Sequence, residues 1–332
     1  MTTITEANKP SMLSQAKKMF ISAEYGPFIA LILLLIAGSI VAPTFWTSGN
    51  IMNILQQVSI LGLGALGMTF VIITRYFDLS IAGLLSLCGL LIVGLQSSYG
   101  MGVALAVTFA VAVLAGLLNG TILRFVKGDF GASIMITYGT GTIFSAAALL
   151  YSNGYTMMPA PDPFFEWFGN GKVFSIPVSV AFFLLFAIMF HILLKYTIFG
   201  RSVYLTGANP TAARLSGVPI HRIRTISFVI LAVMVAIGAL IRSAQTLGAT
   251  PTSGQGYELD VIAAVAIGGT SLAGGAGSIV RTLVGVLIIG VLNNLFILIG
   301  LGTYDQMMAK GAIIIASLLL DKRSGFRLLL KR

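Results

Sequence analysis

Long apolar runs, separated by short polar or glycine-containing segments, dominate the chain from residue 27 to residue 320. A membrane-spanning helix needs roughly 20 mostly apolar residues, and ten segments meet or nearly meet that length. They are residues 27–43, 53–74, 79–97, 101–123, 131–151, 176–195, 225–246, 259–273, 280–300 and 306–320. The eighth is short and rich in glycine, so we expect a broken or partly re-entrant span that the protein shields from lipid. The pattern predicts an all-α, polytopic integral membrane protein with about ten transmembrane helices.

Composition supports this class. Apolar residues make up 57% of the chain and charged residues only 9%, whereas soluble domains carry about 25% charged residues. The single cysteine, Cys88, excludes an intrachain disulfide and a cysteine-based metal cluster. The net charge of +10 comes from basic clusters between the apolar runs, without a stripe of interleaved aromatic residues. Membrane lipid is therefore an expected partner and nucleic acid is not.

The basic clusters also predict the orientation. With the N-terminus inside and the spans alternating, all of the 20 Lys and Arg residues except Lys172, Arg242 and Lys310 lie on the inner side. This distribution obeys the positive-inside rule and requires an even number of spans, so both termini are expected to be cytoplasmic. Residues 1–26 are then a cytoplasmic N-terminal segment, 27–320 the transmembrane domain, and 321–332 a basic cytoplasmic tail.

The longest outer loop, residues 152–175, is rich in proline, glycine and aromatic residues. We expect it to lack regular structure. Its aromatic side chains are typical of a belt at the membrane interface. A contact surface for an extracytoplasmic partner is the alternative.

The cytoplasmic loop 195–225 is the most charged interior segment, and it contains the signals of a short helix. Asn209 is a preferred N-cap, and Pro210 follows at the first helical position, where its missing N–H costs nothing. Gly217 suits the left-handed position after the last turn, and Pro219 prevents continuation. The turns between them consist of Thr211, Ala212, Ala213, Arg214, Leu215 and Ser216.

A helix of two turns is unstable alone in water, so it must pack against something. One reading places it on the ends of its own spans. The other seats it in a groove of a cytoplasmic partner, with Ala212 and Leu215 as apolar contacts and Arg214 at the rim. The residues alone leave both readings open.

"GRSVYLTGANPTAARLSGVPIHRIR" resembles the cytoplasmic loop of permease subunits in the ribose-type family of bacterial ABC importers. The resemblance continues in "GYELDVIAAVAIGGTSLAGGAGSIVRTLVGVLIIGVLNNLFILIG" (256–300), in "NILQQVSILGLGALGMTFVIIT" (53–74) and in "DLS" (78–80). It covers roughly residues 50–325 and identifies 27–320 as a transmembrane permease domain.

The resemblance implies a monosaccharide permease in the bacterial inner membrane. Its expected partners are a cytoplasmic ATP-binding subunit, an extracytoplasmic sugar-binding protein and a second permease subunit, either identical or a paralogue. The short helix would then couple the permease to the ATPase, through Asn209, Pro210, Ala212, Ala213, Arg214, Leu215 and Gly217.

Two inner corners depart from the family pattern. The family usually has a Gly-Gly pair where this chain has Arg75 and Tyr76, and a glycine where Arg281 stands. The corners belong to two weakly similar segments, 72–87 and 267–283, each an apolar run with a polar, glycine-containing break. We expect these larger side chains to hinder close backbone packing at the two corners.

The chain offers few residues suited to catalysis or to binding a metal or cofactor. The phosphate-binding pattern G-x-x-x-x-G-K-[ST] is absent, so we expect ATP to be hydrolysed by a partner chain. No catalytic, metal-binding or cofactor-binding residues are expected, because no histidine, serine or carboxylate grouping has the required spacing.

Carboxylates argue against ion coupling, which needs acidic side chains inside the spans. The chain places them at the inner ends (Glu24, Asp78, Asp129, Asp321) and at the outer ends (Asp162, Glu166, Glu258, Asp260, Asp305). An ion-coupled secondary carrier of the same fold is the runner-up, and a non-transporting scaffold is a third reading.

Five polar residues are candidates for the pathway or its outer mouth. Glu258 and Asp260 open the eighth span, where they either cap the helix or line the mouth. Asn119, Asn293 and Asn294 lie in or near spans, where they either face sugar hydroxyls or link helices. Helix linking is the more common role for any single amide.

Overall fold

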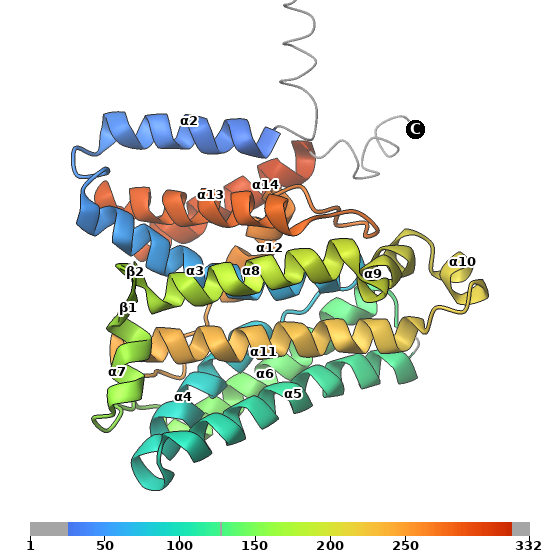
Figure 1. Cartoon of the computed structure of the whole chain (residues 1–332), viewed down its shortest axis with the longest axis horizontal. Coiled ribbons are helices and arrows are strands. Elements are labelled where there is room, and N and C mark those ends of the chain that lie inside the picture. Colours follow the sequence, from blue (N-terminus) through green and yellow to red (C-terminus); the bar gives the residue numbers. More distant parts are fainter. Residues whose placement is uncertain (1–25, 127, 321–332) are drawn as a thin grey trace, which may run out of the picture.

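The computed structural model describes residues 26–126 and 128–320 and is almost entirely helical. Most helices run along one common direction (Figure 1). The helices are α2 (Gly26–Val41), α3 (Ser48–Ile73), α4 (Ile81–Tyr99), α5 (Met101–Phe125), α6 (Phe130–Ser152), α7 (Pro163–Asn170), α8 (Val178–Tyr196), α9 (Ile198–Ala208), α10 (Pro210–Leu215), α11 (Ile220–Thr246), α12 (Tyr257–Ile267), α13 (Ile279–Leu298) and α14 (Thr303–Leu320). A two-residue antiparallel hairpin, β1 (Lys172–Val173) and β2 (Ile176–Pro177), precedes α8.

Seven helices in the described part of the chain are long and apolar enough to cross a membrane: α3, α4, α5, α6, α8, α11 and α13. The chain is therefore an all-α, multi-pass membrane protein. The sequence pattern predicts about ten spans, and the other three expected segments correspond to α2, α12 and α14. The predicted cytoplasmic tail and almost all of the predicted N-terminal segment lie outside the described residues, so the location of the termini stays a prediction.

Helix α3 is the centre of the bundle. In its most apolar stretch 89% of the residues are buried, against 28% in α5 and in α6. Every residue from Val58 to Ile73 is buried, because α8, α11, α12 and α13 pack around this helix. Helices α5 and α6 instead leave large apolar side chains exposed, as helices in contact with lipid do.

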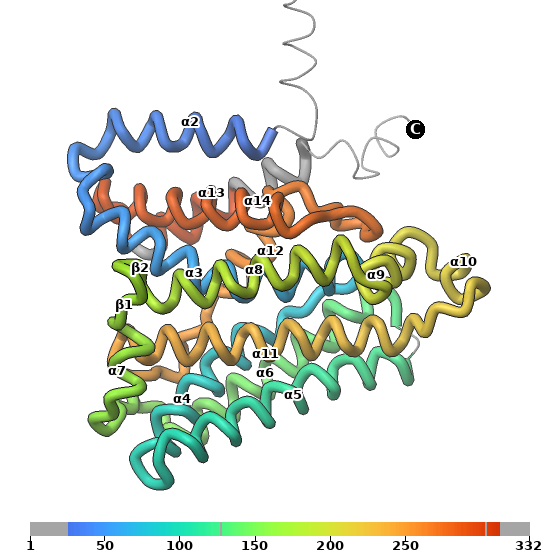
Figure 2. The backbone as a smooth tube through the Cα atoms, viewed as in Figure 1, coloured from blue at the N-terminus to red at the C-terminus, as the bar shows by residue number. Residues whose placement is uncertain are grey.

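The bundle has two distinct ends (Figure 1). We call them the α10 end, which also carries α9 and the start of α11, and the α7 end, which also carries the β1–β2 hairpin. Figure 2 traces the chain out of the bundle through α9 and α10 and back along α11. Charge predicts that the α10 end faces the cytoplasm.

Two non-helical breaks interrupt the bundle at the α10 end. Residues 74–80 separate α3 from α4, and residues 268–278 separate α12 from α13. The breaks touch each other: the Gly275 N–H donates to the carbonyl of Ile73, the last residue of α3, at 2.8 Å, and a Cβ on Gly274 would overlap the Arg75 side chain. Close backbone packing therefore persists at these corners despite Arg75 and Arg281. Helix α12 has only 11 residues, about 16 Å of helix, so the eighth expected span is short, as its glycine content predicts.

Two predictions about loops are wrong. The predicted outer loop, residues 152–175, is not irregular: Asp162 caps α7 by accepting from the Phe165 N–H at 2.9 Å, and Pro163 occupies the first helical position. Phe165 and Phe168 are buried and fix this helix to the bundle.

The predicted cytoplasmic loop, residues 195–225, also contains more helix than expected. Thr197 caps an additional helix, α9, by accepting from the Gly200 N–H at 3.1 Å. Helix α11 begins at Ile220, five residues before the predicted span. The segment that carries α10 is thus a pair of helical stems rather than a flexible loop.

Candidate functional site

The short helix α10 has both of the caps that the sequence indicates. The Asn209 side chain accepts from the Ala212 N–H at 3.0 Å, and Pro210 is the first helical residue. At the other end Gly217 has a φ of +80°, in the left-handed region. The Gly217 and Val218 amides donate to the carbonyls of Arg214 and Ala213, each at 3.0 Å, which is the Schellman arrangement. The backbone at both ends of α10 is therefore hydrogen-bonded within the chain.

Helix α10 packs on its own chain by one side only. Ala213 is 3% exposed, whereas Leu215 is 86% exposed. Residues four apart share a helix face, so Thr211 and Leu215 form an outward face opposite Ala213, and both are exposed. Ala212 and Arg214 are exposed on its flanks. A large apolar side chain is thus presented at the tip of the bundle, beyond the apolar helix surfaces.

The α10 end is strongly basic. Its described cations around α10 include Lys195, Arg201, Arg214, Arg222 and Arg224. Within the described residues the carboxylates at this end are Asp78, which is 2% exposed, and Asp129, which caps α6 by accepting from the Ala132 N–H. Asp129 is exposed but is outnumbered by the cations, so this end favours a partner that carries carboxylates beside an apolar pocket.

Asn119 lies in a buried polar network between α5, α6 and the break 74–80. Its side-chain N–H group donates to Ser80 Oγ at 2.9 Å and to Asp78 Oδ2 at 3.3 Å, and its carbonyl accepts from Thr140 Oγ1 at 2.8 Å. Asp78 also accepts from the Ser80 amide at 2.8 Å. Burial raises the pKa of the Asp78 carboxyl to about 6. These contacts favour helix linking over sugar contact for Asn119.

Asn294 forms a reciprocal pair with Asn50 of α3. Asn50 Nδ2 donates to Asn294 Oδ1 at 3.0 Å, and Asn294 Nδ2 donates to Asn50 Oδ1 at 2.7 Å. Both side chains are less than 10% exposed. The pair joins α3 to α13 by two hydrogen bonds in an apolar environment, which again is a helix-linking role.

We expect Asn294→Ala to destabilise the protein without changing its affinity for substrate. The substitution removes both bonds and leaves the Asn50 carboxamide without its partner, at a cost of about 1–3 kcal/mol in the free energy of unfolding. Thermal melting in detergent measures the loss. Adding Asn50→Ala should cost less than the sum of the two single changes. A changed half-saturating substrate concentration with unchanged melting would contradict the linking role.

The other three pathway candidates lie on the α12–α13 pair. Asp260 Oδ2 forms an ion pair with Nζ of Lys310 of α14, at 2.8 Å. Glu258 and Asn293 are different, since Glu258 Oε2 and Asn293 Oδ1 are buried atoms without a hydrogen-bond partner among the residues that the structure describes. The two helices run antiparallel, with Gly285 packed on the Ala264 carbonyl. The start of α12 and the end of α13, which carry these two oxygens, therefore lie at the same end.

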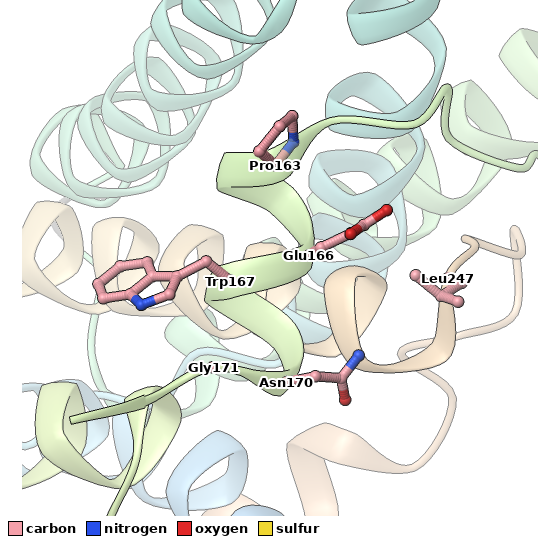
Figure 3. A pocket seen from close by; sticks show the side chains of 6 residues that line it. All are labelled: Pro163, Glu166, Trp167, Asn170, Gly171 and Leu247. Carbon is pink, nitrogen blue, oxygen red and sulfur yellow. The ribbon is translucent and has the colours of Figure 1, made fainter. Parts of the chain in front are cut away.

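A pocket opens beside α7, at the opposite end of the bundle from α10. It is lined by Pro163, Glu166, Trp167, Asn170, Gly171 and Leu247. Figure 3 shows the Glu166 and Asn170 side chains on the same side of α7 as Leu247, while the Trp167 ring points to the other side. The Trp167 ring thus borders the pocket on a different side of α7 from Glu166 and Asn170.

Tyr76 and Arg224 form a polar contact that the sequence analysis did not predict. The Arg224 guanidinium lies 4.0 Å from the centroid of the Tyr76 ring, and its Nη1 donates to the Tyr76 hydroxyl at 2.7 Å. Burial raises the pKa of the Tyr76 phenol, so the hydroxyl keeps its proton and donates to the Gly128 carbonyl at 2.6 Å. The only sequence signal was the departure from the family's Gly-Gly pair.

Comparison with known proteins gives one family match. The model described as "Branched-chain amino acid transport system / permease component" matches residues 50–318. That range includes α10, both breaks and all five pathway candidates. The chain belongs to this permease family. The comparison with solved structures gave no match.

Several characterised relatives resemble the permease over nearly its full length. It is 38% identical to the ribose import permease protein RbsC of Bacillus subtilis (strain 168), over 90% of this chain and 93% of the relative. It is 37% identical to the RbsC protein of Escherichia coli (strain K12), over 90% and 94%. It is 32% identical to the L-arabinose transport system permease protein AraH of Escherichia coli (strain K12), over 90% of each.

These matches confirm the resemblance to ribose-type permeases and the assignment to the bacterial inner membrane. The family consists of transport components, so its members supply a membrane pathway rather than a catalytic centre. An ATPase and a substrate-binding protein are the general partners of such importers. An ion-coupled carrier is not favoured by these relatives.

Proposed function

We propose that this chain is the translocation subunit of an ATP-driven importer for a monosaccharide such as ribose. The observation that carries the proposal is the 37–38% identity to ribose import permeases over 90% of the chain. The description of the family model names branched-chain amino acid transport, so a branched-chain amino acid is the second candidate substrate. The relatives favour the sugar.

Coupling to the ATPase is assigned to α10. Asn209, Pro210 and Gly217 fix the ends of the helix, and Ala213 holds it against the chain, so Ala212, Arg214 and Leu215 remain free for a partner. The partner's groove would offer an apolar pocket for Leu215 and carboxylates for the surrounding arginines. ATP-driven closure of two ATPase subunits would then move the α10 helices of two permease subunits, identical or paralogous, and change the side to which the pathway opens.

The outer mouth is assigned to the α7 end. There an extracytoplasmic sugar-binding protein would release its ligand above the start of α12. Glu258 Oε2 and Asn293 Oδ1 are the atoms best suited to accept hydrogen bonds from sugar hydroxyls, because no donor in the described part of the chain uses them. Asn119, Asn294 and Asp260 are already occupied by other side chains.

The test is uptake in proteoliposomes that contain the permease, its ATPase and its binding protein. Radiolabelled ribose, arabinose and leucine are supplied outside, with ATP present or absent inside. We expect ATP-dependent uptake of a pentose. ATP-dependent uptake of leucine alone would replace the sugar with the second candidate, and uptake driven by a proton or sodium gradient without ATP would overturn the importer assignment.

A further inference from the structure

Two adjacent residues contact both stems of the segment that carries α10. Arg75 lies in the break between α3 and α4, and its Nη2 donates to the Ala208 carbonyl at 2.9 Å. Ala208 is the last residue of α9. The N-cap of α10, Asn209, follows it directly, so Arg75 holds the chain at the point where α10 begins.

Tyr76 holds the other stem. It contacts Arg224 through both its ring and its hydroxyl, and Arg224 lies in the second turn of α11. The Tyr76 hydroxyl also donates to the Gly128 carbonyl between α5 and α6. The entry to α10 and the exit from it are therefore joined to neighbouring residues of one break.

The end of α9 is packed tightly against the end of α3 and the break 268–278. A Cβ on Gly207 would overlap the Ile73 carbonyl oxygen and lie 2.6 Å from the Gly275 nitrogen. The Tyr204 hydroxyl donates to the Gly277 carbonyl at 2.8 Å. Helix α9 thus contacts both breaks, and a displacement of its end must displace them too.

Arg75 makes its contact from an unfavourable backbone conformation. Its φ is +68°, in the left-handed region that glycine adopts freely and other residues adopt at a cost of about 1–3 kcal/mol. Such strain persists where the surroundings determine the conformation. At this position the side chain compensates with a charge-assisted hydrogen bond that a glycine could not make.

We propose that Arg75 and Tyr76 are the positioning residues through which movement of α10 reaches the membrane helices, an inference that rests on the proposed function. Beyond them the break continues to Asp78 and Ser80, which are hydrogen-bonded to Asn119 of α5. Ser80 also immediately precedes α4. A displacement of the α10 stems is passed by this route to α4, α5 and α6.

The experiment compares transport with ATP consumption in proteoliposomes that contain the permease, its ATPase and its binding protein. The variants are Arg75→Ala, Arg75→Lys and Tyr76→Phe, and Tyr138→Phe is the matched control because Tyr138 is an exposed tyrosine on α6. Both the substrate-stimulated ATPase rate and the substrate uptake are measured, together with the amount of intact complex recovered in detergent.

We expect Arg75→Ala and Tyr76→Phe to lower the substrate transported per ATP by about tenfold, the effect of one charge-assisted hydrogen bond. Complex recovery and ATPase rate should stay close to those of the wild type. Arg75→Lys should recover part of the ratio, since an ammonium can still donate to the Ala208 carbonyl.

Two results would overturn the inference. One is an unchanged ratio in both variants. The other is a loss of uptake that follows an equal loss of assembled complex, which is what a purely structural contact predicts. Failure of the wild-type complex to use ATP for uptake would instead overturn the proposed function, so the two failures are distinguishable.

Discussion

Leu215→Asp is expected to lower ATP-driven uptake more than tenfold and to prevent the ATPase subunit from co-purifying with the permease. The side chain is 86% exposed at the tip of α10, so the free permease loses nothing when it is replaced. In a complex, burying a leucine contributes about 1.5–3 kcal/mol, and burying an unpaired carboxylate costs several kcal/mol more. Either amount exceeds the 1.4 kcal/mol that corresponds to a tenfold change in affinity.

A matched control is available at the other end of the bundle. Leu247 is 50% exposed, with a φ of +48°, a conformation that aspartate tolerates better than most residues. Leu247→Asp should leave recovery of the ATPase unchanged. Equal recovery of the ATPase with Leu215→Asp and with the wild type would show that α10 is only packed on its own chain.

Gly207→Ala should produce the largest loss of stability among single conservative changes. Its backbone can accept a side chain, but the Cβ would overlap the Ile73 carbonyl oxygen and press on the Gly275 nitrogen. Helix α9 would have to move away, and the bonds from Arg75 to Ala208 and from Gly275 to Ile73 would be lost with it. Overpacking against backbone atoms costs about 3 kcal/mol, equivalent to a fall of roughly 10 °C in Tm.

Gly102→Ala is the control for this change. Gly102 is also helical, but nothing lies within 4 Å of the position of its Cβ. Alanine at such a site stabilises a helix by about 1 kcal/mol, so its Tm should not fall. Melting temperatures of the two variants in the same detergent decide the matter, and equal values would mean that α9 accommodates the added methyl group.

The sequence predicted best where local chemistry determines the structure. The caps of α10 depend on Asn209, Pro210 and Gly217, and all three occupy the positions expected from their side-chain and backbone preferences. The long apolar helices were also predictable, because their length is set by the thickness of the membrane. The weakly similar segments 72–87 and 267–283 each contain a non-helical break at the α10 end, as the polar, glycine-containing interruptions predicted.

The helices that the sequence analysis missed, α7 and α9, begin with the same kind of capping signal as α10. Asp162 and Pro163 begin α7 by the same chemistry as Asn209 and Pro210 begin α10, but the surrounding glycines and prolines indicated a loop. Thr197 likewise caps α9, within a segment whose charges suggested a connection rather than a helix. In both cases tertiary packing stabilises a helix too short to persist alone.

The site residues were predictable as candidates but not in their contacts. Sequence reasoning could name Asn119 and Asn294 as polar residues within spans. It could not find their partners, because Asn50 is 244 positions from Asn294 and no local rule joins them. The roles of Arg75 and Tyr76 depend on elements from three distant parts of the chain, which only the fold brings together.

The burial of α3 has a consequence for biogenesis. This helix leaves the ribosome well before α11 and α13, which cover it and are synthesised about 150 to 250 residues later. Until α13 arrives, the carboxamide of Asn50 lacks its partner Asn294. A nascent permease must therefore keep a partly polar helix in contact with lipid, or with an insertion chaperone, for most of its synthesis. A chain that stops before α13 would leave the α13-facing side of that helix, with Asn50, uncovered.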